Sequence, residues 1–357
     1  MTSVIMSNNF KISKDTPTYF IADIAANHDG SLERALRLIE LCAESGANAA
    51  KFQHFRAETI VSDFGFQALG KKLTHQAKWQ SSVFEVYKNA ELPFEWTEAL
   101  VKKCQDVGID FFSAVYDLSL IEHLATAMPF FKIGSGDIDW LQAIDVILQT
   151  GKPIFLATGA STFGEVRSTV NHIGSQAPLV LMQCNTNYTA DSQNLQHLNL
   201  RVLETYKFEF PNAILGLSDH TQRNEIIVGA VAMGARVIER HFTDDVDRIG
   251  PDHKFSLSPV MWRDMVNQVR VLESALGDGE KKVEDNEKDA RVVQRRSIRA
   301  NREIKAGEIL NEGDLICLRP CPSDAISPAQ LNQVIGIVAK QDLKIHELIP
   351  RDWLMQA

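Results

Sequence analysis

Two histidines, His220 and His241, stand at the ends of consecutive predicted strands, residues 213–217 and 237–241. If these strands are neighbours in one sheet, the two imidazoles can bind one divalent metal and leave positions open for water and substrate. The spacing itself is not a recognised metal motif, so the interpretation depends on both histidines lying at adjacent strand ends. The carboxylates that could complete or orient such a site are Asp23, Asp219 and Glu239.

Two lysines, Lys51 and Lys132, also stand in or after apolar runs. Lys132 precedes the turn Gly134-Ser135-Gly136, which exposes backbone N–H groups. Two ammonium groups beside such a turn would form a phosphate-binding site. Two alternatives remain open at this point: each lysine could pair with a carboxylate of the same sheet, or one could be the desolvated nucleophile of a Schiff-base aldolase.

Eight short apolar runs alternate with longer helical patterns and would position these residues. Mostly continuous apolar stretches are typical of strands covered on both faces. The predicted strands are residues 19–24, 49–53, 110–114, 130–133, 153–157, 179–183, 213–217 and 237–241. The clearest predicted helices are residues 32–45 and 94–107, which end at Gly46 and Gly108, and residues 226–233 and 260–276.

Eight consecutive βα units indicate a (β/α)8 TIM barrel. The competing fold, an open doubly wound sheet, usually carries a GxGxxG turn after its first strand, and here the turn reads Ala25-Ala26-Asn27-His28-Asp29-Gly30. Functional side chains of a barrel lie at the C-terminal ends of its strands, so we expect the polar residues there to converge in one basin. They are Asp23, Asn27, His28, Lys51, Gln53, Ser113, Lys132, Ser135, Thr158, Asn185, Tyr188, Asp219, His220, Glu239 and His241.

The segment from His54 to Glu91 is unusually long for a connection between a strand and its helix. It contains several basic and aromatic side chains, and it is interpreted either as a lid or as a solvated excursion. Those side chains are Arg56, Lys71, Lys72, His75 and Trp79.

The composition changes near residue 278, which predicts three parts. Residues 1–278 form the barrel, residues 279–296 form a Gly-, Glu- and Lys-rich linker with some helix, and residues 297–357 form a small, mostly β domain. The last part carries short β-like runs at 297–301, 304–308, 314–318, 336–339 and 348–353. Because so few residues cannot build a large core, we expect this domain to pack on something else.

Composition bounds the kind of protein. The chain has 357 residues, 45% hydrophobic and 23% charged, with a net charge of −9, which argues against nucleic-acid or anionic-membrane partners. Its five cysteines are irregularly spaced and are interpreted as reduced thiols, and the polar N-terminus has no signal-peptide core. We therefore expect a cytoplasmic protein.

Several stretches together resemble the sialic acid synthase family. They are Ile21-Ala22-Asp23-Ile24-Ala25-Ala26-Asn27-His28-Asp29-Gly30, Lys51-Phe52-Gln53, Lys132-Ile133-Gly134-Ser135-Gly136-Asp137, Gly216-Leu217-Ser218-Asp219-His220-Thr221, Ile238-Glu239-Arg240-His241-Phe242-Thr243, Gly250-Pro251-Asp252 and Leu318-Arg319-Pro320. The motifs stand in the family's order over nearly the whole chain. The small domain looks like the antifreeze-like (SAF) module that ends these synthases.

The resemblance implies condensation of phosphoenolpyruvate with the open-chain aldehyde of an N-acetylated hexosamine, giving a nonulosonic acid and phosphate. It implies that His220 and His241 hold Mn2+, with Mg2+ or Co2+ as other possibilities. The implied roles of the other residues are phosphoenolpyruvate binding for Lys51, Ser113, Lys132, Ser135, Asn185 and Thr186, sugar binding for Asp137, Tyr188, Asp252 and Arg319, and catalysis for Asp23, Gln53 and Glu239 beside the histidines. In the family the arginine matching Arg319 reaches the barrel of the partner subunit, which implies a domain-swapped homodimer.

Departures from the family pattern all touch substrate contacts. Asp23 and Asp137 stand where Glu is usual, which shortens each carboxylate by one methylene. The other departures are Ala114 for Thr, Ala157 for Ser, Thr186 for Asn beside Asn185, and Cys321 for Gly. We expect retained phosphoenolpyruvate chemistry with an altered acceptor sugar, of the N-acetylmannosamine type or a diacetamido-trideoxyhexose. The alternatives are a Schiff-base aldolase or lyase and a binding protein without activity.

Overall fold

The computed structural model describes residues 4–71, 76, 77, 79–188 and 192–356, and the chain divides into two compact units, Met1–Gly277 and Asp278–Ala357. Each unit has its own buried apolar cluster. The predicted lid residues Lys72 and His75 lie outside the described residues. Among the described helices, none combines the length and the apolar character needed to cross a bilayer.

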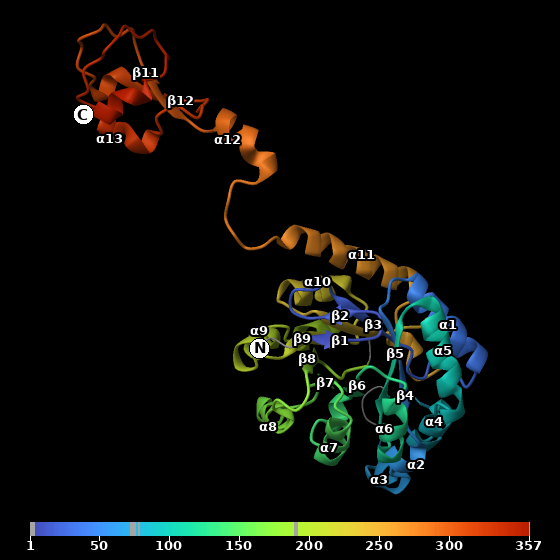
Figure 1. Cartoon of the computed structure of the whole chain (residues 1–357). Coiled ribbons are helices and arrows are strands. Elements are labelled where there is room, and N and C mark those ends of the chain that lie inside the picture. The colour runs from blue at the N-terminus through green and yellow to red at the C-terminus, as the bar shows by residue number, and fades with distance from the viewer. Residues whose placement is uncertain (1–3, 72–75, 78, 189–191, 357) are drawn as a thin grey trace. The chain divides into compact units, whose positions relative to one another are not determined.

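Within the described part of the first unit, eight parallel strands close into a barrel in the order β10-β3-β4-β5-β6-β7-β8-β9 (Figure 1). The predicted (β/α)8 fold is confirmed. The strands are β3 (Tyr19–Asp23), β4 (Ala49–His54), β5 (Asp110–Val115), β6 (Phe131–Ile133), β7 (Ile154–Ala157), β8 (Leu179–Cys184), β9 (Ile214–Asp219) and β10 (Val237–His241). Each predicted strand is present within two residues at either end.

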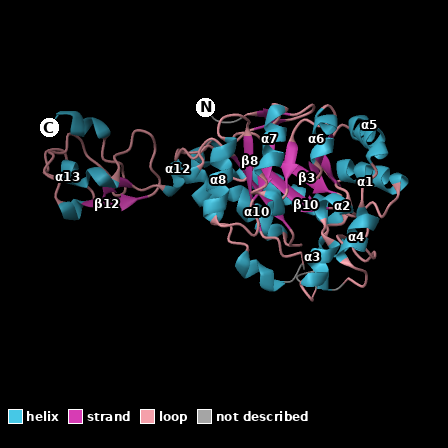
Figure 2. Ribbon diagram, turned by 90° about the horizontal axis from the view of Figure 1, so that it is seen from below, coloured by secondary structure: helices cyan, strands magenta, loops and turns pink. Residues whose placement is uncertain are grey.

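Each barrel strand is followed by a helix, and Figure 2 shows the strands inside the surrounding helices. These helices are α1 (Leu32–Glu44), α5 (Thr97–Val107), α6 (Leu118–Ala125), α7 (Leu141–Gln149), α8 (Phe163–Ile173), α9 (Val202–Glu209), α10 (Asn224–Ala232) and α11 (Pro259–Leu276). Local chemistry sets their ends. Ser31 caps α1 by accepting from the Arg34 N–H, and Ser258 caps α11 before Pro259. Gly108, with φ of 76°, ends α5.

Aromatic rings fill the interior of the barrel toward the N-terminal ends of its strands. The ring of Phe130 lies 4.3 Å from Phe155, 4.8 Å from Phe112 and 6.0 Å from Tyr19. Such layers of large side chains make the interior of a barrel a packed core. One polar contact joins this layer, since the Tyr19 hydroxyl donates to Asp110 at the start of β5, and the polar side chains that line the cavity lie at the C-terminal ends of the strands.

The long segment after β4 folds into helices α2 (Ala57–Ile60), α3 (Asp63–Ala68) and α4 (Val83–Ala90), which lie near one another (Figures 1 and 2). Ser82 and Glu85 form a capping box at the start of α4. A short 3-10 helix, Phe94–Trp96, then leads into α5. The excursion is therefore ordered over the part that the structure describes.

Shorter elements complete the first unit. An antiparallel hairpin of β1 (Ile5–Met6) and β2 (Lys11–Ile12) precedes the barrel. The 3-10 helices Ser135–Asp137, Ser192–His197 and His253–Phe255 lie in loops that follow β6, β8 and β10.

The second unit pairs β11 (Ser297–Ala300) with β12 (Leu315–Leu318) in an antiparallel sheet. Its helices are α12 (Lys288–Gln294) and α13 (Leu331–Val334), with 3-10 helices Asp285–Glu287, Glu312–Asp314, Pro328–Gln330 and Arg351–Gln356. Isolated bridges join Ile304 to Leu343 and Ile309 to Val338. The prediction of a β-like run over 348–353 is partly wrong, because residues from Arg351 onward form a 3-10 helix.

Candidate active site

A cavity with a volume of about 340 Å3 opens at the C-terminal end of the barrel. Eleven of the residues predicted from the sequence line it: Asp23, Lys51, Gln53, Lys132, Ser135, Asp137, Tyr188, His220, Glu239, His241 and Asp252. These residues come from six different strands or the loops that follow them, so the closed barrel brings together positions up to 229 residues apart in the chain.

Asp23 and Lys51 form a buried ion pair on the floor of the cavity. The Lys51 Nζ lies 2.6 Å from Asp23 Oδ2, and both side chains are at most 3% exposed. Burial raises the pKa of Asp23 against the lowering effect of Lys51. Burial alone would lower the pKa of Lys51, but the charges of Asp23 and Glu239 together raise it. The raised pKa keeps Lys51 in its protonated ammonium form, which suits an anion better than it suits nucleophilic attack.

Lys132 and Glu239 form a second buried pair across the barrel, with Nζ 3.1 Å from Oε1. The Ser218 hydroxyl donates to the same oxygen at 3.0 Å. Burial tends to raise the pKa of Glu239, but the charges of Lys132 and Lys51 outweigh it and lower the pKa to about 2. Both lysines thus have carboxylate partners, as the structural alternative predicted, and both also line the cavity.

His220 and His241 lie side by side, with ring centroids 5.4 Å apart. The Nδ1–H of His220 donates to the backbone carbonyl of Asn185 at 2.9 Å, which leaves Nε2 as the ligating atom. Burial, followed by the charge of His241, lowers the pKa of His220 to about 4. The ring is therefore neutral near pH 7, the form that binds a metal ion.

The residues around this pair fit a divalent ion held by few protein ligands. Asp23 Oδ2 lies 3.7 Å from His241 Nε2, and Glu239 Oε2 is buried with no hydrogen-bond partner among the described residues. Among the described residues, no group of three or more His, Cys, Asp or Glu side chains is arranged to hold a metal ion. An ion at this site would have the two imidazoles as protein ligands and water or substrate as its other ligands.

Ser135 and Asp137 lie together on the short helix after β6. The Ser135 hydroxyl accepts a hydrogen bond from the Gly159 N–H at 2.9 Å, which fixes it beside Lys132 at the cavity wall. Burial, with a smaller effect of Asp139, raises the pKa of Asp137 to about 6. Asp137 can therefore exchange a proton near neutral pH.

Tyr188 and Asp252 line the side of the cavity near the histidines. The Tyr188 ring lies 4.1 Å from the His220 ring. Asp252 accepts a hydrogen bond from the Ala26 N–H at 3.1 Å, and burial raises its pKa to about 7. A carboxyl group of this kind can donate or accept a hydrogen bond to a sugar hydroxyl.

The structure does not bring Ser113 to the cavity. Ser113 pairs in register with Phe52 rather than with the inward-facing Gln53, and its hydroxyl contacts His54 Nδ1 at 2.8 Å. Successive side chains of a strand point to opposite faces, so Ala114 takes the inward position at this level. The sequence prediction selected the neighbouring residue, on the outer side of the barrel.

Asn185, Thr186 and Asp219 are also absent from the cavity lining. The side-chain amide of Asn185 donates to the His197 carbonyl, and the backbone carbonyl of Asn185 accepts from His220 Nδ1. Asp219 pairs with the fully buried Arg240 at 3.1 Å on the outer side of β9 and β10, which explains why it does not reach His220 and His241. Arg319 is exposed in the second unit, and its predicted contact with a sugar stays a prediction.

Sequence reasoning missed an apolar wall of the cavity. It is formed mainly by the excursion after β4, and its residues are Phe55, Ile60, Trp79, Val86, Tyr87 and Ala90, together with Tyr116 after β5. Of these residues only Trp79 belongs to the basic and aromatic set predicted for this segment. The amphipathic pattern of residues 83–90 could have predicted this wall. Val83 is buried, and Val86 and Tyr87 line the cavity.

Comparison with known proteins identifies the family. A model of the NeuB family matches residues 38–281, and a model of the SAF domain matches residues 295–354. The chain belongs to the NeuB family. Its resemblance to sialic acid synthases, predicted from the motifs, is thereby confirmed, and the protein is an enzyme of this family.

Individual relatives agree with this assignment. N,N'-diacetyllegionaminic acid synthase of Campylobacter jejuni is 34% identical over 340 residues, covering 93% of this chain and 98% of that protein. Pseudaminic acid synthase of the same species is 31% identical over 339 residues, covering 94% and 96%. The crystal structure of N-acetylneuraminic acid synthetase from Leptospira borgpetersenii superposes with a TM-score of 0.70 at 27% identity, covering 81% of this chain and 95% of that one.

Proposed function

We propose that this NeuB-family enzyme condenses phosphoenolpyruvate with the open-chain aldehyde of an N-acylated amino sugar. C3 of phosphoenolpyruvate forms a bond to the aldehyde carbon, whose oxygen takes up a proton. Water adds to C2, and phosphate leaves as its C–O bond breaks. The products are a nonulosonic acid and inorganic phosphate, and the acceptor is an N-acetylmannosamine-type sugar or a diacetamido-trideoxyhexose.

A single observation supports this proposal: the Lys51 and Lys132 pair and the His220 and His241 pair line one cavity. Phosphoenolpyruvate carries a carboxylate and a phosphate, and the two ammonium groups with the Ser135 hydroxyl and nearby N–H groups suit those anions. A binding protein for a neutral sugar would have no need for two buried lysines at one end of its site.

The charge of the cavity supports a resident divalent ion. Among the described lining residues the two lysines face four carboxyl groups, Asp23, Asp137, Glu239 and Asp252. Such a cavity has no excess of positive charge with which to bind a polyanion. His220 and His241 would hold Mn2+, or Mg2+ or Co2+, and the ion would supply Lewis-acid polarisation of the aldehyde oxygen.

Two carboxyl groups are suited to proton exchange. Asp23 lies within 3.5 Å of the Gln53 amide and is held by Lys51, so its position is fixed near the reacting atoms. Asp137, with a pKa of about 6, faces the same cavity without an ion-pair partner among the described residues. Because Asp23 is shorter than glutamate, we assign it to proton exchange through a water molecule, whereas Asp137 can reach a sugar hydroxyl directly.

The buried lysines argue against the Schiff-base alternative. A lysine nucleophile must be neutral, and the carboxylates beside Lys51 raise its pKa. We also propose that the enzyme is a homodimer in which Arg319 of one subunit reaches the sugar site of the other. The exposed position of Arg319 is compatible with that role.

The decisive experiment measures phosphate release from phosphoenolpyruvate with a panel of N-acetylated hexosamines and diacetamido-trideoxyhexoses in the presence of Mn2+. We expect sugar-dependent release that EDTA abolishes and added Mn2+ restores. Failure of every acceptor would reject the proposed reaction. Reductive trapping with borohydride and pyruvate should leave Lys51 and Lys132 unmodified, and labelling of either residue would support the aldolase instead.

A further inference from the structure

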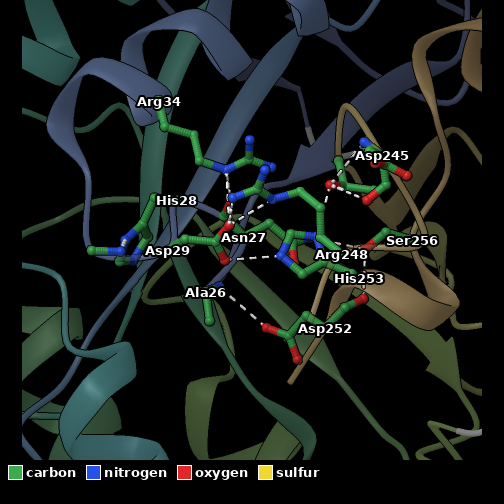
Figure 3. Close-up of polar contacts among 12 residues, drawn as sticks. Ala26, Asn27, His28, Asp29, Arg34, Asp245, Arg248, Asp252, His253 and Ser256 are labelled. Carbon is green, nitrogen blue, oxygen red and sulfur yellow. Dashed lines mark hydrogen bonds and ion pairs between the residues drawn. The ribbon is translucent and has the colours of Figure 1, made fainter. Parts of the chain in front are cut away.

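Two loops meet where the last and first strands of the barrel pair, and a polar network joins them (Figure 3). Strands β10 and β3 run in register from Val237 beside Tyr19 to His241 beside Asp23. The loop after β3 covers residues 24–31, and the loop after β10 covers residues 242–258. The proposed reaction assigns a role to Asp252 but none to the charged residues that surround it.

Asp29 is the centre of this network. Its Oδ2 lies 2.7 Å from Arg248 Nη2 and 3.2 Å from Arg34 Nε, and its Oδ1 lies 2.9 Å from His253 Nε2 (Figure 3). Arg34 also binds Asp244 through both terminal nitrogens. Asp29 has φ of 50°, a backbone conformation uncommon for residues other than glycine. One carboxylate therefore joins the first loop to two residues of the second.

His253 connects Asp29 to the neighbouring Asp252. The His253 ring is fully buried, and burial lowers its pKa, so it is neutral near pH 7. An ionised Asp29 can only accept, so the proton of the ring lies on Nε2, and Nδ1 then accepts from the Thr243 hydroxyl at 2.8 Å. The ring packs so tightly that a Cβ at Gly250 would lie 2.6 Å from His253 Cδ2.

Asp252 itself is held from both loops. Its carboxylate accepts from the Ala26 N–H at 3.1 Å, and its backbone carbonyl accepts from the Ser256 hydroxyl at 2.7 Å. The Ser256 hydroxyl also accepts a hydrogen bond from the side-chain amide of Asn27 at 2.9 Å, and the same amide donates to the Phe242 carbonyl. The position of Asp252 at the cavity thus depends on how the two loops are joined.

Phe255 and Leu257 bury the end of the second loop, but apolar packing does not fix its middle part, residues 244–250. Residues 244–250 are exposed or half-buried, and Ile249 is fully exposed. The barrel is already closed by the pairing of β10 with β3, so the fold does not require the network. The network contacts the segment that carries Asp252 on both sides of that residue, through Arg248 and His253.

We infer that Asp29 is a positioning residue for the acceptor end of the site: through His253 and Arg248 it holds Asp252 against the cavity. This inference depends on the proposed function for its catalytic consequence, since Asp252 is the group expected to contact the acceptor sugar. Asp29 lies outside the cavity lining and acts only through the loop.

Asp29→Asn tests the inference, because it removes the charge and keeps the shape. We expect the KM for the acceptor to rise about tenfold and the KM for phosphoenolpyruvate to change less than twofold. The double variant with Asp29→Asn and Asp252→Asn should have a kcat/KM for the acceptor less than twofold below that of Asp252→Asn alone, because both changes act on the same contact between Asp252 and the acceptor. Equal changes in both KM values, an unchanged acceptor KM or full multiplication of the two effects would overturn the inference.

Asp145→Asn is the matched control. Asp145 pairs with His172 at 2.6 Å between α7 and α8, so the change removes a similar carboxylate–histidine contact away from the cavity. Both KM values should stay within twofold of the wild type. If Asp29→Asn does not fold, as judged by its thermal transition, Arg248→Gln makes the same test, since the Arg248 side chain is 42% exposed.

A measurement independent of turnover separates this inference from the proposed reaction. The Asp252 carboxyl resonance, assigned by its loss in Asp252→Asn, should titrate near pH 7 in the wild type because the group is buried. In Asp29→Asn its pKa should fall by about one unit as the released loop exposes it to water. An unchanged titration would refute the positioning role even if every acceptor sugar fails in the activity assay.

Discussion

Gly159, at the start of the loop after β7, should be essential for the anion site because no side chain fits there. A Cβ at this position would lie 2.5 Å from Thr186 Cγ2, 2.9 Å from Ser135 Oγ and 3.1 Å from Cys184 Sγ. Real Cβ contacts are about 3.4 Å or longer, so Gly159→Ala must displace at least two of these groups. The Gly159 N–H also donates to Ser135 Oγ at 2.9 Å, so the side chain that moves is one proposed to bind phosphoenolpyruvate.

The magnitude follows from the contact that is lost. Overpacking of this kind costs about 1–3 kcal/mol of stability. A hydrogen bond to a charged ligand contributes about 1.5–3 kcal/mol, so displacement of Ser135 should raise the KM for phosphoenolpyruvate roughly 10- to 150-fold. The KM for the acceptor is expected to change less, because Tyr188, one of the residues proposed to contact the acceptor, lies beside His220.

Initial rates of phosphate release at varied phosphoenolpyruvate give this KM, and a thermal transition reports stability. Gly164→Ala is the control: it lies in the first turn of α8, where the nearest atom to a new Cβ is 3.8 Å away, so neither quantity should fall. A Gly159→Ala enzyme with the KM of the wild type would refute the reasoning, since it would mean that Thr186 and Cys184 move and Ser135 does not.

Two further predictions separate functional from structural charges. Burial raises the pKa of Asp252 to about 7 from an ordinary value near 3.9, so between these values the folded protein holds a proton that the unfolded chain releases. The free energy of unfolding of the wild type, relative to that of Asp252→Asn, should therefore fall as the pH rises from about 4 to about 7. If urea unfolding gives the same difference between the two proteins at every pH, the prediction is wrong. Arg240→Met should leave the buried Asp219 carboxylate with the Thr221 hydroxyl but without its cationic partner, and lower the free energy of unfolding by about 3–5 kcal/mol, while His220 and His241 remain. Unchanged urea unfolding would show that the ion pair contributes nothing to stability.

Much of the fold and site was predictable because both follow from local patterns. Apolar runs marked each barrel strand within two residues, and polar residues at the strand ends marked the cavity. Lys51 and His241 illustrate this, since each follows apolar residues near the C-terminal end of its strand. A barrel then requires such residues to meet, whatever their separation along the chain.

Other features depended on which way a side chain points. Ser113 and Ala114 are adjacent in one strand, and the apolar run around them does not reveal which of the two faces inward. Asp219 and His220 present the same ambiguity: Asp219 turns outward to Arg240, and His220 lines the cavity. The closed barrel decides each case, because register with the neighbouring strands determines the orientation.

The sequence by itself therefore determined the order of the elements, the family and most of the polar groups at the mouth of the barrel, since these depend on the type and periodicity of residues. Only the tertiary structure decided that each lysine has a carboxylate partner, that an excursion of 38 residues, 54–91, supplies an apolar wall, and that Asp29 joins two loops more than 200 residues apart. The physical reason is that ion pairs and packing act over a few ångströms in space, and distance along the chain carries almost no information about them.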